Sequence, residues 1–408
     1  MDFGLIGERL EHSYSPEIHQ RLRGYAYQLC PMAPAELPAF FARRDFKGIN
    51  VTIPYKQAVF SYCDALSDAA RRVGAVNTIV RRADGTLYGD NTDPAGFDYM
   101  LREAGICLAG RHVLVLGNGG ASRTVQLVAA DRRAKSVTAA DFDLDVNYGN
   151  LYARCPDAQV LVNATPVGMF PHADACPAEP ERFPRLQAVA DLIYNPLRTH
   201  FLQKAQNIGL QTADGLSMLV AQAAASAALF TGEPCGEEDA ARVLAGLRRD
   251  LENWVLVGMP GSGKTTAGQI LAKRSGRPFV DLDLEIEKRA GQPGREILLR
   301  QGEAAFREIE AQLAAEFGAK TGQVIATGGG TPLRPENAEA LRSNGRLLWI
   351  KRDIRYLATA GRPLSVDLEN LERVRRPSYE AAADIQITHN EDWEALFGEA
   401  WRVFTDEN

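Results

Sequence analysis

The segment Gly258-Met-Pro-Gly-Ser-Gly-Lys-Thr265 constrains this chain more than any other part of the sequence. It follows the apolar run Trp254–Val257 and precedes Thr266–Lys273, whose apolar residues recur with helical spacing. Glycines let backbone N–H groups turn inward around a polyphosphate, at a helix N-terminus that already carries partial positive charge. The order of strand, glycine-rich turn and helix therefore predicts a nucleoside triphosphate site in an α/β domain. A chance glycine-rich turn is the alternative, and both flanks argue against it.

The residue types in this turn predict separate roles. Lys264 can reach the β- and γ-phosphates of ATP, and the hydroxyl of Thr265 can ligate Mg²⁺. The residues expected to contact the nucleotide are Gly258, Gly261, Ser262, Gly263, Lys264, Thr265 and Thr266.

Size and composition indicate a multidomain globular protein. A chain of 408 residues is long enough for two or three domains. The net charge of −6 gives no reason to expect nucleic acid or an anionic membrane as a partner. The six cysteines are scattered, which predicts reduced thiols in a cytoplasmic protein and neither a zinc site nor a disulfide frame. The apolar stretch 218–230 is too short to cross a bilayer and is typical of a packed helix.

Polar residues near the N-terminus follow short predicted strands. Ser13 and Ser15 precede a predicted helix at Pro16 and could grip a polyol, although a serine there could equally cap the helix. Residues 48–53 predict a strand, and Lys56 lies just past its end. Catalytic groups often occupy that place in α/β folds, but an exposed lysine is more often only a solubilising charge.

Two further polar residues precede the middle of the chain. Asn77 lies within a predicted strand over 74–80, so its amide must hydrogen-bond to backbone or to a ligand. Asp93 lies in a turn before a helix that opens at Pro94, where it could orient a substrate or simply cap the helix.

A second glycine-rich turn predicts a dinucleotide site. The buried strand His112–Leu116 leads into Gly117–Ser122, with a helix expected from Arg123 onward. The next predicted strand ends at Asp141, 24 positions after Gly117, close to where an acid binds the ribose 2′-hydroxyl of NAD. The residues expected to contact this cofactor are Gly117, Gly119, Gly120, Ala121 and Asp141.

Acidic and basic residues follow the phosphate-binding turn. Asp281 and Asp283 end the predicted strand 279–283 on the same side, one toward Mg²⁺ and one toward an acceptor hydroxyl. Arg307 lies in a predicted helix, and Gly328-Gly-Gly330 ends a strand where backbone can approach a ligand closely. The arginines around Arg375 could bind an anion or form a solvated helix face.

Motifs in two blocks resemble two families. Residues 1 to about 250 resemble shikimate dehydrogenase through His12-Ser-Tyr-Ser-Pro16, Asn50-Val-Thr-Ile-Pro-Tyr-Lys56, Gly74-Ala-Val-Asn-Thr78, Gly89-Asp-Asn-Thr-Asp93, Asn163-Ala-Thr-Pro166, Tyr194-Asn-Pro196 and Gly215 to Gln222. Residues 253 to about 405 resemble shikimate kinase through the phosphate-binding turn, Asp281-Leu-Asp283, Phe306-Arg307, Gly328-Gly-Gly330, Arg362-Pro-Leu364 and Arg375 to Tyr379.

The two resemblances imply an α/β fold in three parts. These are an N-terminal α/β substrate domain (1–98 with 213–250), a Rossmann-like dinucleotide domain (99–212), and a P-loop NTPase-type three-layer α/β/α kinase domain (253–408). They imply one enzyme that reduces 3-dehydroshikimate to shikimate with NADP(H) or NAD(H), then phosphorylates the shikimate 3-hydroxyl with ATP and Mg²⁺. Small molecules are the expected partners, and monomer and homodimer both stay open.

The dehydrogenase resemblance assigns roles to single residues. It implies that Lys56 is the acid/base group and that Asp93 orients it. The residues implied to hold shikimate are Ser13, Ser15, Asn77, Asp93 and Gln222, with help from Thr52 and Tyr194.

The kinase resemblance assigns a second set. Asp283 would orient the 3-hydroxyl and accept its proton, Arg307 and Arg375 would clamp the carboxylate, and Gly329 would give a backbone contact. Arg362 would close from a lid onto the phosphates, and Thr265 and Asp281 would hold the metal.

The cofactor region departs from the family pattern. The family usually ends its second Rossmann strand with Asn-Arg-Thr, where arginine pairs with the 2′-phosphate of NADP, whereas Asp141-Phe-Asp143 stands here. Two carboxylates repel a phosphate, which favours NAD. Only 19 residues separate Asp143 from Asn163, so the domain looks trimmed. A kinase with a binding-only or quinate-using dehydrogenase half is the alternative.

Overall fold

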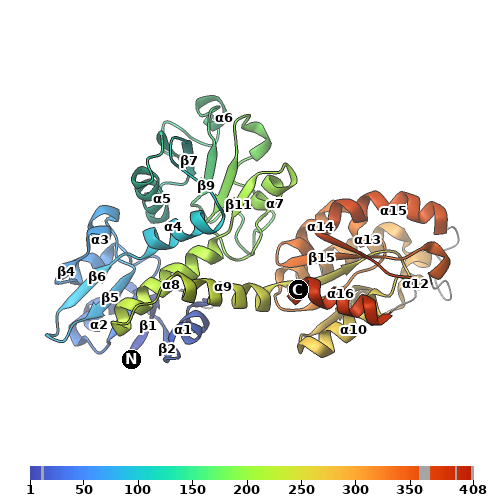
Figure 1. The fold of residues 1–408 in the computed structure, drawn as a ribbon, viewed down its shortest axis with the longest axis horizontal. Coiled ribbons are helices and arrows are strands. Elements are labelled where there is room, and N and C mark those ends of the chain that lie inside the picture. Colours follow the sequence, from blue (N-terminus) through green and yellow to red (C-terminus); the bar gives the residue numbers. More distant parts are fainter. Residues whose placement is uncertain (11–12, 358–367, 391–392, 406–408) are drawn as a thin grey trace. The chain divides into compact units, whose positions relative to one another are not determined.

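The computed structural model describes residues 1–10, 13–357, 368–390 and 393–405. The chain divides into two compact units, Met1–Leu247 and Arg248–Asn408. Along the chain, the division falls inside helix α9, Glu237–Leu251. Figure 1 shows the course of the chain through both units, which are described separately below.

The first unit contains two sheets, and the first sheet is mixed. Its six strands are ordered β2-β1-β3-β5-β6-β4. Strand β1 pairs in parallel with β2 and β3, whereas β5 runs antiparallel to β3 and β6. The strands are β1 Phe3–Gly7, β2 Tyr27–Pro31, β3 Gly48–Val51, β4 Ala65–Leu66, β5 Thr78–Arg81 and β6 Leu87–Asp90.

Apolar side chains cover this sheet on both faces. One cluster joins Ile6, Ile49 and Ile79 to Phe41 of helix α2, and another joins Leu5 and Tyr27 to Phe230 of α8. The helices of this part are α1 Ser15–Arg23, α2 Leu37–Arg43, α3 Asp68–Val73, α4 Asp93–Glu103 and α8 Gly215–Thr231. The alanine-rich stretch 218–230 is therefore the packed helix that its composition predicts.

The second sheet of this unit is parallel throughout, with order β11-β10-β9-β7-β8. Valines of β7 and β9 face α4 and α5, and the alternating Leu114, Leu116 and Leu161 face α6 and α7. Its elements are β7 His112–Leu116, α5 Gly120–Asp131, β8 Ser136–Ala140, α6 Leu151–Arg154, β9 Val160–Asn163, β10 Ala188–Asp191, α7 His200–Asn207 and β11 Gln211–Ala213. The strand order reverses between β7 and β9, where α/β folds bind ligands at the carboxyl ends of the strands.

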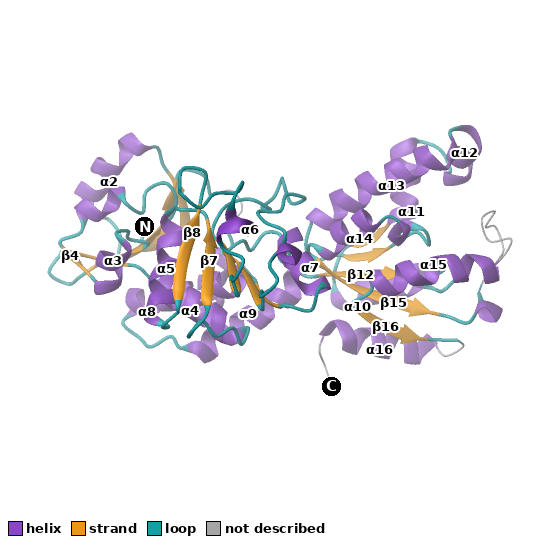
Figure 2. Cartoon of the chain, turned by 90° about the horizontal axis from the view of Figure 1, so that it is seen from above, coloured by secondary structure: helices purple, strands orange, loops and turns teal. Residues whose placement is uncertain are grey.

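The second unit is a three-layer α/β/α domain around the parallel sheet β13-β14-β12-β15-β16. Helices α13, α14 and α15 pack on one face of the sheet, and α10 and α16 pack on the other (Figure 2). Its strands are β12 Asn253–Val257, β13 Phe279–Asp281, β14 Val324–Ala326, β15 Gly345–Lys351 and β16 Ile385–Thr388. Its helices are α10 Lys264–Ser275, α11 Leu282–Ala290, α12 Gly294–Arg300, α13 Gly302–Ala319, α14 Pro335–Arg342, α15 Leu368–Ala382 and α16 Trp393–Thr405.

The predicted α/β class and the strand, turn and helix around the phosphate-binding segment are confirmed. Several local predictions are wrong. Helix α5 begins at Gly120 instead of Arg123, so the glycine turn itself forms the first helical turn. Strand β3 ends at Val51, and Asn77 precedes strand β5 instead of lying inside it.

Between β8 and β9, where every residue is described, α6 is the one helix and no strand forms. Among the described residues, no helix combines the length and apolarity needed to cross a membrane.

Candidate active sites of the two units

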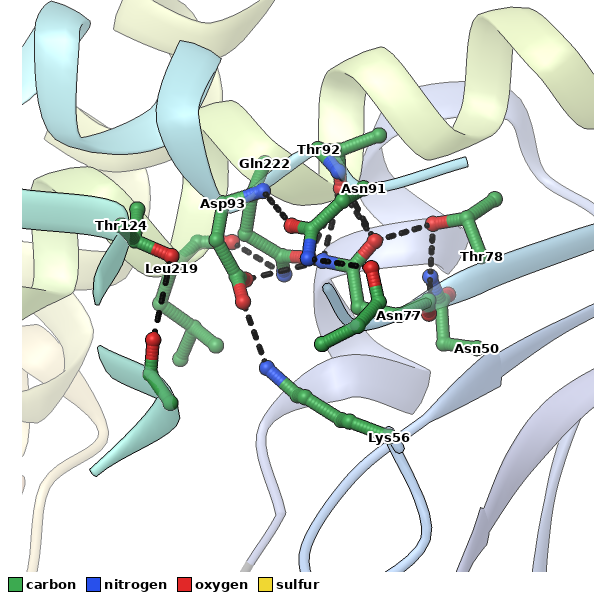
Figure 3. Close-up of polar contacts among 12 residues, drawn as sticks. Asn50, Lys56, Asn77, Thr78, Asn91, Thr92, Asp93, Thr124, Leu219 and Gln222 are labelled. Carbon is green, nitrogen blue, oxygen red and sulfur yellow. Dashed lines mark hydrogen bonds and ion pairs between the residues drawn. The ribbon is translucent and has the colours of Figure 1, made fainter. Parts of the chain in front are cut away.

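Lys56 and Asp93 form an ion pair in the first unit. Lys56 lies in the turn that follows β3, and Asp93 is the first residue of α4. The Lys56 Nζ atom lies 2.6 Å from Asp93 Oδ2, and the two side chains are 29% and 13% exposed (Figure 3). The helix-cap alternative for Asp93 does not hold, because Thr92 is the N-cap residue. The lysine therefore has a fixed counter-ion and remains accessible to a small molecule.

Asn77 holds the other oxygen of Asp93. Its side-chain nitrogen donates to Asp93 Oδ1 at 2.8 Å, to Thr92 Oγ1 at 3.0 Å and to Gln222 Oε1 at 3.4 Å. Its side-chain oxygen accepts from the Thr92 backbone nitrogen at 2.8 Å. Lys56, Asn77, Asp93 and Gln222, named from the sequence, are thus brought together (Figure 3).

A second row of buried polar residues supports this group, and the sequence analysis missed it. Ser226 contacts Thr78 at 2.8 Å and Thr92 at 3.1 Å, and it accepts from Asn50 at 2.9 Å. The signal was present for Ser226, because it lies four residues after Gln222 and helix residues at that spacing share a face. Asn50 lies 176 positions before Ser226, so that contact depends on the tertiary fold.

The remaining predicted substrate residues come from neighbouring loops. Ser13 and Ser15 contact each other through their hydroxyls at 3.1 Å, and Tyr14 is the cap residue of α1, so neither serine caps it. Thr52 follows β3, the strand beside β1. The ring of Tyr194 lies 5.7 Å from that of Tyr14, which brings the loop after β10 against the serine turn.

The second glycine-rich turn is open at the N-terminus of α5. Gly117 has φ of +102°, and a Cβ there would lie 2.8 Å from Thr165, so both the backbone and the packing require glycine. A Cβ added at Gly119 or Gly120 would meet nothing within 4 Å among the described residues, and Ala121 beside them is exposed. Asp141 follows β8 directly, and its Oδ1 accepts from the Phe142 backbone nitrogen at 2.8 Å. The first N–H groups of a helix have no partner within the helix, and open space at this helix start beside an acid suits a dinucleotide.

Asp191, a fully buried acid that the sequence analysis did not single out, connects the loops around this turn. It accepts from Asn163 at 3.0 Å, from Thr199 at 2.7 Å and from the Ile193 backbone nitrogen at 3.1 Å. Burial raises the pKa of Asp191 to about 7, although these three hydrogen bonds lower it. The residue fixes the loops after β9 and β10, including the one that carries Tyr194.

The phosphate-binding turn of the second unit has a backbone that glycine alone adopts readily. Gly258, Gly261 and Gly263 have φ of +144°, +83° and +98°. The buried Lys264 Nζ donates to the carbonyls of Gly258 and Met259 at 2.9 Å each. Thr266 follows in the first turn of α10.

Two hydroxyls complete the same turn. Ser262 Oγ is buried and lacks a hydrogen-bond partner among the described residues, which suits a phosphate oxygen. Thr265 Oγ1 donates to Asp281 Oδ2 at 2.8 Å. A hydroxyl beside a carboxylate is the donor set that P-loop proteins use for Mg²⁺ with nucleotide phosphates.

Asp283 lies in the first turn of α11, which contradicts the prediction that it shares one side of a strand with Asp281. Asp281 ends the strand by capping this helix, with Oδ1 accepting from the backbone nitrogens of Asp283 and Leu284. The Asp283 residue is exposed, yet the protein packed around its carboxylate raises its pKa to about 6. The positive charge of Lys264 lowers this pKa, and Asp281 and Glu310 raise it further.

Arg307 and Arg375 lie on the helices around Asp283. Arg307 pairs with the buried Glu310 at 2.8 Å, and Glu310 also accepts from Thr331 Oγ1 at 2.7 Å. Glu310 was not named from the sequence, although its position three residues after Arg307 places it on the same helix face. Arg375 is buried, so the solvated-face alternative is wrong for that arginine.

The glycines after β14 bring backbone between these groups. A Cβ at Gly328 would lie 2.7 Å from Asp283 Oδ1, and one at Gly330 would lie 2.4 Å from the Arg307 guanidinium. The Gly329 carbonyl accepts from Tyr379 Oη at 2.5 Å. Burial raises the pKa of Tyr379 to about 12, and the nearby charge of Arg375 lowers it. Arg362 and the expected lid around it lie outside the described residues.

Two family models match separate parts of the chain. Residues 5–79 match the shikimate dehydrogenase substrate binding domain, and residues 260–403 match shikimate kinase. A shikimate dehydrogenase (NADP(+)) of Clostridium perfringens is 36% identical in an alignment of length 261 that covers 56% of this chain and 92% of the relative. One from Thermus thermophilus is 37% identical in an alignment of length 266 that covers 60% of this chain and 99% of the relative.

Solved structures resemble the same region. A chorismate mutase/shikimate 5-dehydrogenase fusion protein from Clostridium acetobutylicum is 33% identical, with a TM-score of 0.57, and covers 60% of this chain and 96% of its own. A quinate dehydrogenase from Corynebacterium glutamicum, in complex with NAD, is 27% identical, with a TM-score of 0.55, and covers 60% of this chain and 98% of its own. The chain therefore belongs to the shikimate dehydrogenase family and carries a shikimate kinase domain after it, so one polypeptide holds two enzymes of the shikimate pathway.

Proposed function

We propose that this chain reduces 3-dehydroshikimate to shikimate and then phosphorylates the shikimate 3-hydroxyl. The observation that carries the proposal is that each unit combines a glycine-rich turn with a positioned proton-transfer group. Lys56 is paired with Asp93 in the first unit, and Asp283 lies within the field of Lys264 in the second. The two separate sheets of the first unit support its division into two domains. The first sheet with α8 would form the substrate domain (1–98 with 213–250), and the second sheet would form the dinucleotide domain (99–212).

In the first reaction, Lys56 supplies the proton. A reduced nicotinamide, when bound, supplies hydride to the 3-keto carbon. Lys56, as an ammonium ion, stabilises the charge that builds on the carbonyl oxygen and then donates its proton to that oxygen. Asp93 keeps the ammonium in place, and Asn77 keeps Asp93 in place.

The side chains around Lys56 suit a carboxylated polyol. Ser13 and Ser15 offer hydroxyls from the turn before α1, and Gln222 offers an amide from α8. Thr52 and Tyr194 would border the same substrate. These assignments follow the residues that the family motifs match, and the ring contact between Tyr14 and Tyr194 supports the nearness of the two loops.

For the cofactor we propose NAD in preference to NADP. Asp141 and Asp143 follow the end of β8, where the 2′-phosphate of NADP would meet two carboxylates. The bacterial relatives bear the name NADP(+), whereas the Corynebacterium structure is a complex with NAD. Initial rates with NADH and NADPH at equal concentrations test this preference, and a strong preference for NADPH would refute it.

In the second reaction, Asp283 accepts the proton of the shikimate 3-hydroxyl. Arg307 and Arg375 provide guanidinium forks for the substrate carboxylate, and Gly329 provides backbone beside it. Lys264 and the N–H groups of the phosphate-binding turn bind the phosphates of ATP. Mg²⁺, when bound by Thr265 and Asp281, neutralises phosphate charge.

One coupled experiment tests the whole proposal. The purified chain receives 3-dehydroshikimate, reduced cofactor and Mg·ATP, and the product is identified by chromatography and mass. Shikimate 3-phosphate is the expected product. Phosphorylation of added shikimate without reduction of 3-dehydroshikimate would leave a kinase with a binding-only first unit. Because a quinate dehydrogenase is among the structural neighbours, the reverse assay with quinate and NAD tests that substrate.

A further inference from the structure

The apolar side chain of Phe142 lies mostly in water. Its side chain is 80% exposed, more than any other large hydrophobic residue that the structure describes. A phenyl ring in water forgoes the burial that normally stabilises it. It also follows Asp141, the acid expected at the cofactor ribose, by one position.

The strand pairing brings Phe142 to the cofactor edge of the sheet. Strand β8 is the edge strand, and Ala140 lies opposite Leu116 of β7. The Gly117 backbone nitrogen donates to the Ala140 carbonyl at 2.8 Å. Asp141 and Phe142 therefore leave the sheet beside the first glycine of the dinucleotide turn.

The ring of Tyr148 packs against the exposed ring of Phe142. The two ring centroids lie 4.8 Å apart, at an interplanar angle of 49°. Tyr148 itself packs on the apolar cluster beneath β7 and β9, and the turn that carries Phe142 is closed by Asp141 N donating to Val146 O at 3.1 Å. Burial and the Asp141 carboxylate raise the pKa of Tyr148, which keeps its phenol neutral. The pair is thus an anchored aromatic surface with one free face.

We propose that Phe142, packed against Tyr148, stacks on the adenine of NAD. In NAD the adenine is joined to the ribose carbon next to the one that bears the 2′-hydroxyl. A group that binds this hydroxyl and a ring that stacks on the base must therefore be neighbours, as Asp141 and Phe142 are. The aromatic surface of Phe142 and Tyr148 is neutral, so it can bind the uncharged base. It carries no positive charge for a 2′-phosphate, and the carboxylates of Asp141 and Asp143 lie on either side of Phe142 in the sequence.

The proposal rests on the proposed dehydrogenase function, and binding to truncated ligands tests it without turnover. Titration calorimetry on the full chain would compare NAD, ADP-ribose, which lacks nicotinamide, and nicotinamide mononucleotide, which lacks adenine. Base–aromatic stacking predicts that Phe142→Ala weakens NAD and ADP-ribose by about fivefold to a hundredfold. Binding of nicotinamide mononucleotide should not change.

Two variants serve as controls. Phe142→Trp retains a flat ring and should keep ADP-ribose affinity near that of the wild type. Ile208→Ala removes another exposed apolar side chain of the same unit, 48% exposed at the end of α7, and should leave all three ligands unaffected.

Three results would overturn the inference. The first is equal weakening of all ligands by Phe142→Ala, and the second is unchanged ADP-ribose affinity. The third is a change in sedimentation with cofactor binding intact, which would make Phe142 a contact between copies of the chain. If the ligand pattern holds in a protein that does not reduce 3-dehydroshikimate, the inference stands and the proposed function fails.

Discussion

The protonation of Asp283 should set the acid limit of kinase activity. The pKa of Asp283 is raised from 3.8 to about 6, because the surrounding protein limits its hydration and neighbouring carboxylates repel its charge. Only the carboxylate form can accept the proton of the 3-hydroxyl. At pH 5 about one tenth of Asp283 is ionised, so kcat/KM for shikimate should fall about tenfold between pH 7 and pH 5. At the ordinary value, about nine tenths would remain ionised at pH 5.

The assay must separate this group from the titration of the substrate. Rates would be measured with shikimate and Mg·ATP both well below their KM values, so that the profile reports the free enzyme, with direct chromatography of shikimate 3-phosphate. Glu287 raises the pKa of Asp283 by its charge, so Glu287→Gln should move the acid limb to lower pH. The carboxylate of free shikimate cannot respond to that substitution.

Two results would contradict the role of Asp283. A rate that stays level down to pH 4.5 would show that Asp283 does not titrate in this range or does not accept the proton. If the acid side of the pH–rate profile does not shift in Glu287→Gln, the titrating group is not Asp283. Glu336→Gln on α14 is a matched control, because Glu336 is not among the charges that shift the pKa of Asp283.

Three other substitutions test separate parts of the chain. Lys56→Ala should lower dehydrogenase turnover about 10²- to 10⁴-fold, while calorimetry shows shikimate binding largely kept; lost binding with normal turnover would contradict the acid/base role. In Gly330→Ala the new Cβ would displace the movable end of Arg307, so the kinase KM for shikimate should rise about tenfold or more while that for ATP stays level. The folded state binds the proton of Asp191 more tightly than the unfolded state, so the contribution of Asp191 to wild-type stability falls as pH rises from about 4 to about 7. Asp191→Asn removes that dependence, and its free energy of unfolding relative to wild type, measured in urea, should climb through this window by up to about 4 kcal/mol and then level off.

Some of this molecule can be predicted from short stretches of sequence. Strand β12 was predicted within a residue, and helix α10 begins at Lys264, two residues earlier than predicted, because an apolar run, a glycine-rich turn and a following helix all lie in one local segment. The contact of Asn50 with Ser226 could not be predicted in this way, since it joins residues 176 positions apart. The start of α5 at Gly120 was predicted three residues too late, at Arg123. Glycine has low helix propensity, so the glycine-rich turn was expected to continue to Ser122.

The wrong prediction at Asp283 has a physical cause that bears on the kinase site. Five residues cannot distinguish a strand from the start of a helix by periodicity alone. In a strand, Asp281 and Asp283 would have pointed the same way about 7 Å apart. Instead, Asp281 Oδ1 caps α11 and so fixes the turn that carries Asp283, while Asp281 Oδ2 accepts from Thr265. One side chain thus positions both the metal-side hydroxyl and the proton acceptor. Asparagine at 281 would keep the cap but lose the charge, whereas alanine would lose both, so a comparison of Asp281→Asn with Asp281→Ala separates metal binding from the positioning of Asp283.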